Sequence, residues 1–198
     1  MTSPQEPILP IGDGHTPLGD DDRSGLKLSY ITTRGELNEA EQDNILRARR
    51  ALRVPTVNTL LDDRYLRQLH KAMFGDVWQW AGQYRQREMS IGIDPSQIAT
   101  SVRDLVSDAK LWVVHEAPRR VAARFHHRLV WIHLFTNGNG RHGRQAADML
   151  MQALGQPAFT WGSADAARSI ERVRKEYLNA LRAADRGDFA PLEEFVVS

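Results

Sequence analysis

Apolar side chains recur at intervals of three or four residues along most of this chain, the spacing that places them on one face of an α-helix. Polar and charged residues fill the positions between them, so each apolar stripe predicts an amphipathic helix with one buried face. Six such stripes span Leu37–Leu52, Leu66–Phe74, Ile98–Val113, Val121–Ile132, Ala147–Leu154 and Ile170–Leu181. The pattern therefore predicts an all-α domain.

Several residues mark where these helices begin and end. Asp62 precedes the second stripe as a start signal, and Ser163 is the candidate N-cap of the sixth. Gly155 closes the fifth stripe, in the position where a left-handed residue ends a helix. A short last helix is predicted after Pro191 and ends near Phe195.

Two segments depart from the helical period. Residues 1–25 are rich in Pro, Gly and Asp, a composition that buries little apolar surface, and they predict a tail outside a domain at 26–198. In 83–93 (QYRQREMSIGI), apolar residues alternate from Met89 to Ile93. This alternation favours a strand or a small β-hairpin inserted between the second and third helices.

Composition narrows the classes of function. The 198 residues carry 26 Lys and Arg against 25 Asp and Glu, so the net charge of +1 gives no general field for nucleic acid or membrane. The absence of cysteine excludes disulfides, thiolate nucleophiles and Cys-ligated zinc. Met1–Pro10 lacks the pattern of a signal peptide and no apolar run reaches the length of a membrane span, so a cytoplasmic protein is expected. One basic cluster is interpreted as a solvated helix face: Arg47, Arg49, Arg50 and Arg53.

The stretch HLFTNGNGRHGR, which begins at His133, differs from the helices around it. Gly138 and Gly140 allow positive φ angles, and the amides of such a turn, together with a following helix N-terminus, form a site for an anion. Arg141 and Arg144 are three residues apart and therefore project from one helix face. With His133 beside them as a titratable base, these residue types suggest a nucleotide phosphate site with a proton acceptor.

Two other interpretations of the stretch are open at the level of residue types. A glycine-rich turn with two solvated arginines would need no ligand. A zinc site is disfavoured, because the histidines lack the helical i, i+4 pair and a placed acidic partner. The histidines in question are His126, His127, His133 and His142.

The stretch resembles the signature of the Fic (Fido) family, His-x-Phe-x-acidic/Asn-Gly-Asn-Gly-Arg-x-x-Arg. Every fixed position is matched, by His133, Phe135, Asn137, Gly138, Asn139, Gly140, Arg141 and Arg144. FGDVWQWAGQYR at 74–85 resembles the family's segment before its β-hairpin flap, and 177–196 resembles its C-terminal helices. The likeness covers 26–198 and is greatest to the bacterial group labelled mobile mystery protein B. It implies a Fic-type helical bundle with a small β-hairpin flap inserted between helices.

The resemblance implies a protein adenylyltransferase, which moves AMP from ATP to a Ser, Thr or Tyr hydroxyl of a target protein and releases pyrophosphate. His133 is then the general base for that hydroxyl. Phe135 is expected to pack inward and orient the loop. Leu134 stands where proline is usual in the family, which leaves the backbone at His133 less restricted.

The resemblance also assigns ligands for ATP, Mg²⁺ and the target. The expected phosphate ligands are Asn139 with the amides at Gly138 and Gly140 for the α-phosphate, Arg141 for the next phosphate and Arg144 for the γ-phosphate. Asn137 is expected to help hold Mg²⁺, although its neutral amide is a weaker ligand for a hard cation than the acidic residue of many members. Residues 84–93 are expected to form the flap that binds a target peptide through main-chain hydrogen bonds.

Residues 32–52 are a candidate inhibitory helix. Fic proteins often carry the pattern Ser/Thr-x-x-x-Glu followed by Gly or Asn, and its glutamate pairs with the second motif arginine. Thr32 and Glu36 have this spacing, with leucine in place of the Gly or Asn. Glu36 would then pair with Arg144 and exclude the γ-phosphate. The alternative is a capping box from Thr33 to Glu36 at the start of a helix.

Alternatives to adenylyl transfer arise on the same fold. The domain could be a non-catalytic or toxin–antitoxin-type binding module, although intact His133 and Arg144 argue against a pure scaffold. A related enzyme could transfer UMP, phosphocholine or a phosphate, because the loop determines phosphate handling and not the group transferred. The resemblance also allows a separately encoded regulator, whereas direct contact with nucleic acid or membrane is not expected.

Overall fold

A computed structural model describes residues 25–163 and 168–198. The helices are α2 (Arg34–Ala51), α3 (Val57–Leu60), α4 (Asp63–Phe74), α5 (Ile98–His115), α6 (Pro118–Ile132), α7 (Asn139–Ala153), α8 (Ile170–Asp185) and α9 (Ala190–Phe195), with a 3₁₀ turn at Pro95–Gln97. Within the described residues no β-strand is formed, and an isolated bridge joins Leu26 to Trp78. The all-α prediction is confirmed, while the predicted tail at 1–25 lies outside the described residues except for residue 25.

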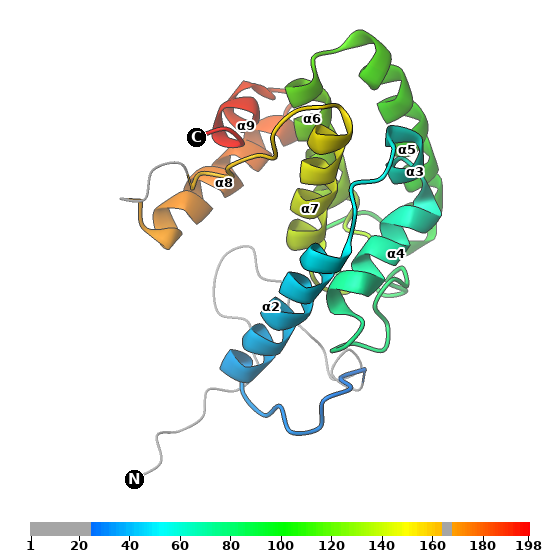
Figure 1. The fold of residues 1–198 in the computed structure, drawn as a ribbon, viewed down its shortest axis with the longest axis vertical. Helices are drawn as coiled ribbons and strands as arrows, with labels where there is room; N and C mark the ends of the chain where they lie inside the picture. Colours follow the sequence, from blue (N-terminus) through cyan, green and yellow to red (C-terminus); the bar gives the residue numbers. More distant parts are fainter. Residues whose placement is uncertain (1–24, 164–167) are drawn as a thin grey trace.

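α6 and α7 lie side by side at the centre of the fold (Figure 1). α5, α8 and α9 pack against α6, whereas α3 and α4 pack against α7. α2 lies along α4, so the N-terminal part of the described chain packs beside this helix. The connection between the two central helices, residues 133–138, carries the sequence predicted to perform chemistry.

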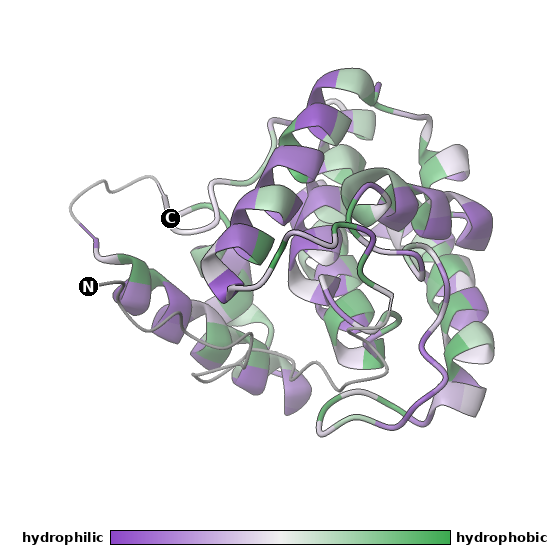
Figure 2. Ribbon diagram, turned by 90° about the horizontal axis from the view of Figure 1, so that it is seen from below, coloured by the Kyte–Doolittle hydropathy of each residue, from purple (hydrophilic) through white to green (hydrophobic). Residues whose placement is uncertain are grey.

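The core is built from the apolar faces that the periodicity predicts. Hydrophobic and hydrophilic residues occupy different sides of the helices (Figure 2). The large side chains with almost no exposed surface include Phe74, Trp78, Phe125, Leu129 and Phe135. Burying such a side chain contributes about 1.5–3 kcal/mol to the stability of the fold. Across the described ranges, no helix combines the length and apolar character needed to cross a bilayer.

Helix starts follow the local capping signals, with one exception. Asp62 accepts a hydrogen bond from Tyr65 N at 3.1 Å and caps α4, as predicted. The predicted cap of the sixth helix at Ser163 is wrong, because α8 begins at Ile170 behind Ser169. Ser163 closes a turn instead, because its N–H and its hydroxyl both donate to the Thr160 carbonyl, at 3.1 and 2.5 Å. Its hydroxyl therefore points back along the chain and not to the amides that an N-cap would bind.

The β-hairpin expected at 84–93 is not formed. The two arms of the segment hydrogen-bond to the C-terminal end of α6 instead of to each other. Arg85 donates its backbone N–H to the Leu134 carbonyl at 3.0 Å, and Ile93 donates to the Ile132 carbonyl at 3.4 Å. Helix ends leave carbonyl groups without intrahelical partners, and these offer the acceptors that a partner strand would otherwise supply. Residues 84–93 are therefore an irregular loop that lies along the end of α6.

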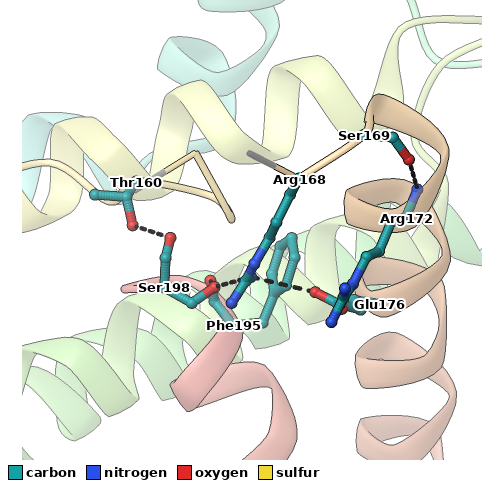
Figure 3. Close-up of polar contacts among 7 residues, drawn as sticks. All are labelled: Thr160, Arg168, Ser169, Arg172, Glu176, Phe195 and Ser198. Atoms are coloured by element: carbon teal, nitrogen blue, oxygen red, sulfur yellow. Dashed lines mark hydrogen bonds and ion pairs between the residues drawn. The ribbon is translucent and has the colours of Figure 1, made fainter. Parts of the chain in front are cut away.

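A polar cluster joins the start of α8 to the end of the described chain (Figure 3). Arg168 Nη1 lies 3.2 Å from Glu176 Oε2 and 3.2 Å from Ser198 Oγ. Thr160 donates its hydroxyl to the Ser198 carbonyl at 2.8 Å. The cluster fixes the position of α8, whose Tyr177 ring packs against the first turn of α7.

Candidate functional site

The connection between α6 and α7 is a tight turn with a left-handed residue at each end. His133 is the C-cap of α6 with a φ of 58°, and Gly138 is the N-cap of α7 with a φ of 79°. The Asn139 side chain closes the turn, because its Oδ1 accepts from Phe135 N at 2.9 Å and its Nδ2 donates to the Phe135 carbonyl at 2.7 Å. A positive φ is uncommon for histidine, so the turn holds the predicted base in a strained conformation.

Two buried rings form the floor of this turn. Phe74 lies so close beneath Gly138 that a Cβ at this glycine would be 2.5 Å from the ring. Phe135 has no exposed surface, as its predicted inward packing requires, and stacks on His70 with ring centroids 3.7 Å apart. The loop therefore rests on a rigid aromatic base with little freedom to shift.

His70, which the sequence analysis did not single out, links this floor to the loop. Its Nδ1 accepts from Gly82 N–H at 3.0 Å, so its Nε2 carries the proton that is donated to the Asn137 carbonyl at 3.0 Å. Burial holds the pKa of His70 well below its ordinary value. The ring is therefore neutral, and its two hydrogen bonds connect Gly82 to the turn between α6 and α7.

His133 is poised to accept a proton. Its side chain is 4% exposed, and its pKa is lowered to about 4. Burial is the largest cause, the positive charge of Arg85 acts in the same direction, and a hydrogen bond with the Val130 backbone opposes both. The imidazole is therefore neutral at neutral pH, which is the state that a general base requires.

Arg85 connects the loop at 84–93 to this histidine. The side chain is 3% exposed, its Nε donates to the His133 carbonyl at 2.7 Å, and its Nη1 donates to the Arg87 carbonyl at 2.9 Å. Its Nη2 donates to the Ile93 carbonyl at the other end of the loop. One arginine thus pairs carbonyls from α6 and from both arms of the loop. The sequence placed Arg85 only in the segment before the expected flap, with no signal for this role.

The two motif arginines lie on the first two turns of α7 and have different partners. Arg141 Nη2 lies 2.6 Å from Glu41 Oε2, and its guanidinium packs over the Phe74 ring at 4.9 Å from the centroid. Arg144 packs over the Tyr177 ring of α8 at 5.5 Å from the centroid. Arg141 is therefore held by side chains of α2 and α4, whereas Arg144 packs on a side chain of α8.

The N-terminus of α7 is shaped to receive an anion. Gly138, its N-cap, has no side chain that could accept from the first amides of the helix. A Cβ placed on Gly140 would come no closer than 4.0 Å to the Tyr177 hydroxyl, so no side chain crowds the helix at this residue. These amides and the two motif arginines all lie on the first two turns of α7, where the helix dipole is positive.

Residues 60–151 match the Fic/DOC family. The chain contains a Fic/DOC domain. The matched segment runs from α3 into α7, so it includes the turn, both motif arginines and Arg85. Helix α2, with Glu41, precedes the matched residues, and α8 with Tyr177 follows them.

Curated relatives of this Fic/DOC domain carry the name protein adenylyltransferase. The protein of that name from Culex quinquefasciatus is 28% identical over 147 residues, which is 70% of this chain and 27% of the relative. The Caenorhabditis elegans protein adenylyltransferase fic-1 is 27% identical over 139 residues, 65% of this chain and 25% of the relative. The chain spans about a quarter of the length of these relatives.

Solved Fic structures share the fold of the domain. Fic-1 from C. elegans aligns with a TM-score of 0.62 at 23% identity, over 88% of this chain and 50% of that one. BepC from Bartonella tribocorum, solved with bound AMPPNP, aligns with a TM-score of 0.67 at 19% identity, over 87% of this chain and 90% of that one. At this level of identity the likeness establishes the arrangement of the helices.

The histidines of the Fic/DOC domain do not gather around a metal. His126 Nε2 lies 2.9 Å from the Tyr177 hydroxyl, His127 Nε2 lies 2.9 Å from Asp185, and His142 Nε2 lies 2.9 Å from the Leu66 carbonyl. In the part of the chain that the structure describes, no group of three or more His, Cys, Asp or Glu side chains could hold a metal ion. The structure thus gives the zinc interpretation no support.

Glu36 takes the capping position at the start of α2, ahead of the residues that match the family. Its carboxylate accepts from Thr32 N at 2.8 Å and from Thr33 N at 2.9 Å, and the Thr33 hydroxyl accepts in return from Glu36 N. The capping box is complete at the start of α2. These main-chain donors, and not Arg144, are the partners of the Glu36 carboxylate in this structure. They also hold the pKa of Glu36 below its ordinary value.

Proposed function

We propose that the Fic/DOC domain is a protein adenylyltransferase, which transfers AMP from ATP to a hydroxyl of a target protein and releases pyrophosphate. The observation that carries the proposal is the turn from α6 to α7. It sets a buried, neutral His133 beside an uncapped helix N-terminus flanked by Arg141 and Arg144. The names of the curated relatives and the AMPPNP in the BepC structure support a nucleotide as the donor.

The chemical step uses His133 as the base. Its imidazole accepts the proton of the target hydroxyl while the hydroxyl oxygen forms a bond to the α-phosphorus of ATP. The bond from that phosphorus to the bridging oxygen breaks, and pyrophosphate leaves with the bonding electrons. A positioned base of this kind contributes a factor of about 10²–10⁴ to the rate. The left-handed backbone at His133, whose carbonyl accepts from Arg85, restricts the positions that the imidazole can take.

The polyphosphate lies across the start of α7 in this proposal. The first amides of the helix, from Asn139 to Arg141, bind the α-phosphate and stabilise the charge that grows in the transition state. The Asn139 side chain shapes the turn through Phe135, so its contribution to the α-phosphate comes through the backbone. Arg141 binds the next phosphate, and Arg144 reaches the γ-phosphate.

The residues present fit a Mg²⁺ ion that is held chiefly by ATP. Asn137 can offer one amide oxygen, which already accepts from Gly138 N at 2.7 Å. Magnesium in nucleotide sites is commonly bound by one or two protein ligands together with phosphates and water, which is the arrangement these residues permit. When bound, the ion neutralises charge on the phosphates. Asn137 is therefore assigned to orient that ion.

The target protein is proposed to bind along the loop at 84–93. The loop passes directly beside His133, and its outer residues Gln86, Arg87 and Glu88 are exposed. A cavity of about 260 Å³ between this loop and the motif turn is lined by Trp80, Tyr84, Arg85, Met89 and Thr136, among others. A target segment could add its main chain to the free edge of the loop while its hydroxyl enters next to the base.

The test of the proposal is transfer from ATP labelled at either the α- or the γ-phosphate into bacterial lysate and into the protein itself. Protein-bound label from the α-position alone supports adenylyl transfer, and mass spectrometry of the labelled band identifies the acceptor hydroxyl. Label from the γ-position would instead identify phosphoryl transfer. Nucleotide binding without any transfer would favour the binding-module alternative. Glu36→Gly belongs in the same assay, because a rise in labelling would restore the inhibitory interpretation.

A further inference from the structure

A buried carboxylate on α2 reaches the centre of the site. Glu41 is 1% exposed and lies outside the residues that match the family. Its Oε1 accepts from the Trp78 indole N–H at 2.7 Å and from Asn137 Nδ2 at 3.0 Å, while its Oε2 lies 2.6 Å from Arg141 Nη2. One carboxylate therefore joins a core tryptophan to two residues of the motif.

We propose that Glu41 is a positioning residue for the polyphosphate, which holds Arg141 and Asn137 in the orientation that receives ATP. The inference rests on the proposed function and adds a component from α2. Glu41 itself touches no substrate in this arrangement. It acts through the two motif residues that it binds.

The contacts of Arg141 fix the direction in which its guanidinium points. Its guanidinium is held at one edge by Glu41 and on one face by the Phe74 ring, 4.9 Å from the centroid. The Arg141 side chain is 31% exposed, and its fork carries further N–H donors beyond the Nη2 that contacts Glu41. A guanidinium fixed on two sides loses less conformational entropy when it binds phosphate than a free one does.

Glu41 also decides which way the Asn137 amide faces. An ionised carboxylate accepts hydrogen bonds and donates none, so the amide group nearest to it must be the NH₂ of Asn137. The Asn137 oxygen is thereby turned to the other side, where it accepts from Gly138 N at 2.7 Å. That oxygen is the atom assigned above to a metal ion. Without Glu41, this orientation would rest on the Gly138 N–H alone.

The surroundings of Glu41 favour a permanent brace over a movable blocking group. Both carboxylate oxygens are engaged, and the Trp78 side chain that holds Oε1 is 1% exposed in the core. Asn44, one turn further along α2, donates to the Ala72 carbonyl at 3.0 Å and accepts from Asp76 N at 3.0 Å. This stretch of α2 is therefore bonded to α4 and to the turn after it on the same side as Glu41.

The test is the affinity for AMPPNP with Mg²⁺, measured by calorimetry on the full chain, together with the kinetics of α-label transfer. Glu41→Gln keeps the size of the side chain and removes its charge. Glu39→Gln is the matched control, because Glu39 lies two residues earlier on α2 and is exposed. Circular dichroism and melting curves establish that each variant is folded. Arg141→Gln and the double variant complete a thermodynamic cycle.

We expect Glu41→Gln to weaken AMPPNP binding about tenfold, with a matching rise in the KM for ATP and a kcat changed by less than about threefold. In the Arg141→Gln background, the same change should alter the affinity by less than about twofold. The Glu39→Gln control should match the wild type. A merely structural role would lower the melting temperature without this dependence on Arg141.

Unchanged or tighter AMPPNP binding in folded Glu41→Gln would overturn the inference, as would additive effects in the double variant. A rise in label transfer would identify a blocking group instead. If Glu41→Gln does not fold, Glu41→Asp retains the charge on a shorter stem, and unaltered affinity in that variant overturns the proposal equally. The proposed function is separate: a wild type that binds AMPPNP but transfers nothing contradicts the enzyme, and the binding cycle still decides the role of Glu41. A wild type that binds no nucleotide contradicts both.

Discussion

Replacing Arg85 with glutamine should disturb both the stability of the domain and the titration of its base. The side chain is 3% exposed, and its hydrogen bonds to the carbonyls of His133 and Arg87 measure 2.7 and 2.9 Å. Glutamine is shorter and uncharged, so it can reach at most part of this set. The variant therefore leaves carbonyl groups at the end of α6 without a partner.

The expected loss in the free energy of unfolding follows from these two hydrogen bonds. A hydrogen bond with a charged partner contributes about 1.5–3 kcal/mol, so the pair represents about 3–6 kcal/mol before any compensation. Since the glutamine amide is shorter and neutral and replaces only part of this pair, we expect the free energy of unfolding to fall by about 2–4 kcal/mol. That is a large share of the roughly 5–15 kcal/mol that stabilises a typical domain, and urea denaturation resolves it readily.

The same variant should raise the pKa of His133. The Arg85 charge favours the neutral imidazole, so removing it moves the pKa from about 4 towards its ordinary value, by less than the full difference because burial is the larger cause. A neutral base is required for transfer, so activity is lost as the pH falls through this pKa. The acid limb of kcat/KM against pH should therefore lie at higher pH in Arg85→Gln than in the wild type.

The control is Arg87→Gln, which removes an equal charge from an exposed position of the same loop. It should change the free energy of unfolding by no more than about 0.5 kcal/mol and leave the acid limb in place. The reasoning is refuted if Arg85→Gln loses less than about 1 kcal/mol, since a single neutral hydrogen bond would account for that. An unmoved acid limb would refute the electrostatic part alone.

Three further predictions test the turn and its surroundings. Gly92→Ala should lower transfer at least about tenfold, because its Cβ would lie 2.5 Å from His133 Cβ at a φ of 95°; labelled-ATP kinetics on folded protein check this. Gly138→Ala should lower the melting temperature, since its Cβ would be 2.5 Å from the Phe74 ring, and an unchanged melting curve would contradict the packing described. Glu36→Gln should lower the melting temperature slightly through the cap of α2 and leave transfer unchanged; faster transfer would show that Glu36 is inhibitory.

The helices could be predicted from the sequence because each stripe of apolar residues has only one regular way to be buried. Asp62 and Gly155 marked real ends, whereas Ser163 did not, since its N–H and hydroxyl both donate back to the Thr160 carbonyl. The loop at 84–93 was predicted as a hairpin from its alternation alone. Its backbone partners lie at and just after the end of α6, about forty to fifty residues away in sequence, and no local pattern reports them.

The site was predictable where the chemistry is local. His133, Gly138, Arg141 and Arg144 fall within twelve residues, and the turn brings them together as their spacing suggests. Glu41 was not predictable, because its contact with Arg141 spans one hundred positions and no motif marks it. His70 and Arg85 escaped notice for the same reason, since their roles are to pair backbone groups that appear only when the chain is folded. Asn139 was assigned to phosphate by resemblance, while its side chain in fact closes the turn.

The central claim is that His133 is the base for transfer of AMP, and the most direct measurement compares incorporation of α-phosphate label by the wild type and by His133→Ala. His115→Ala, which changes an exposed histidine at the end of α5, is the matched control. The account predicts protein-bound label with the wild type and with the control, and a loss of at least about 100-fold with His133→Ala in a protein that still binds AMPPNP. Equal labelling by His133→Ala and the wild type would contradict it.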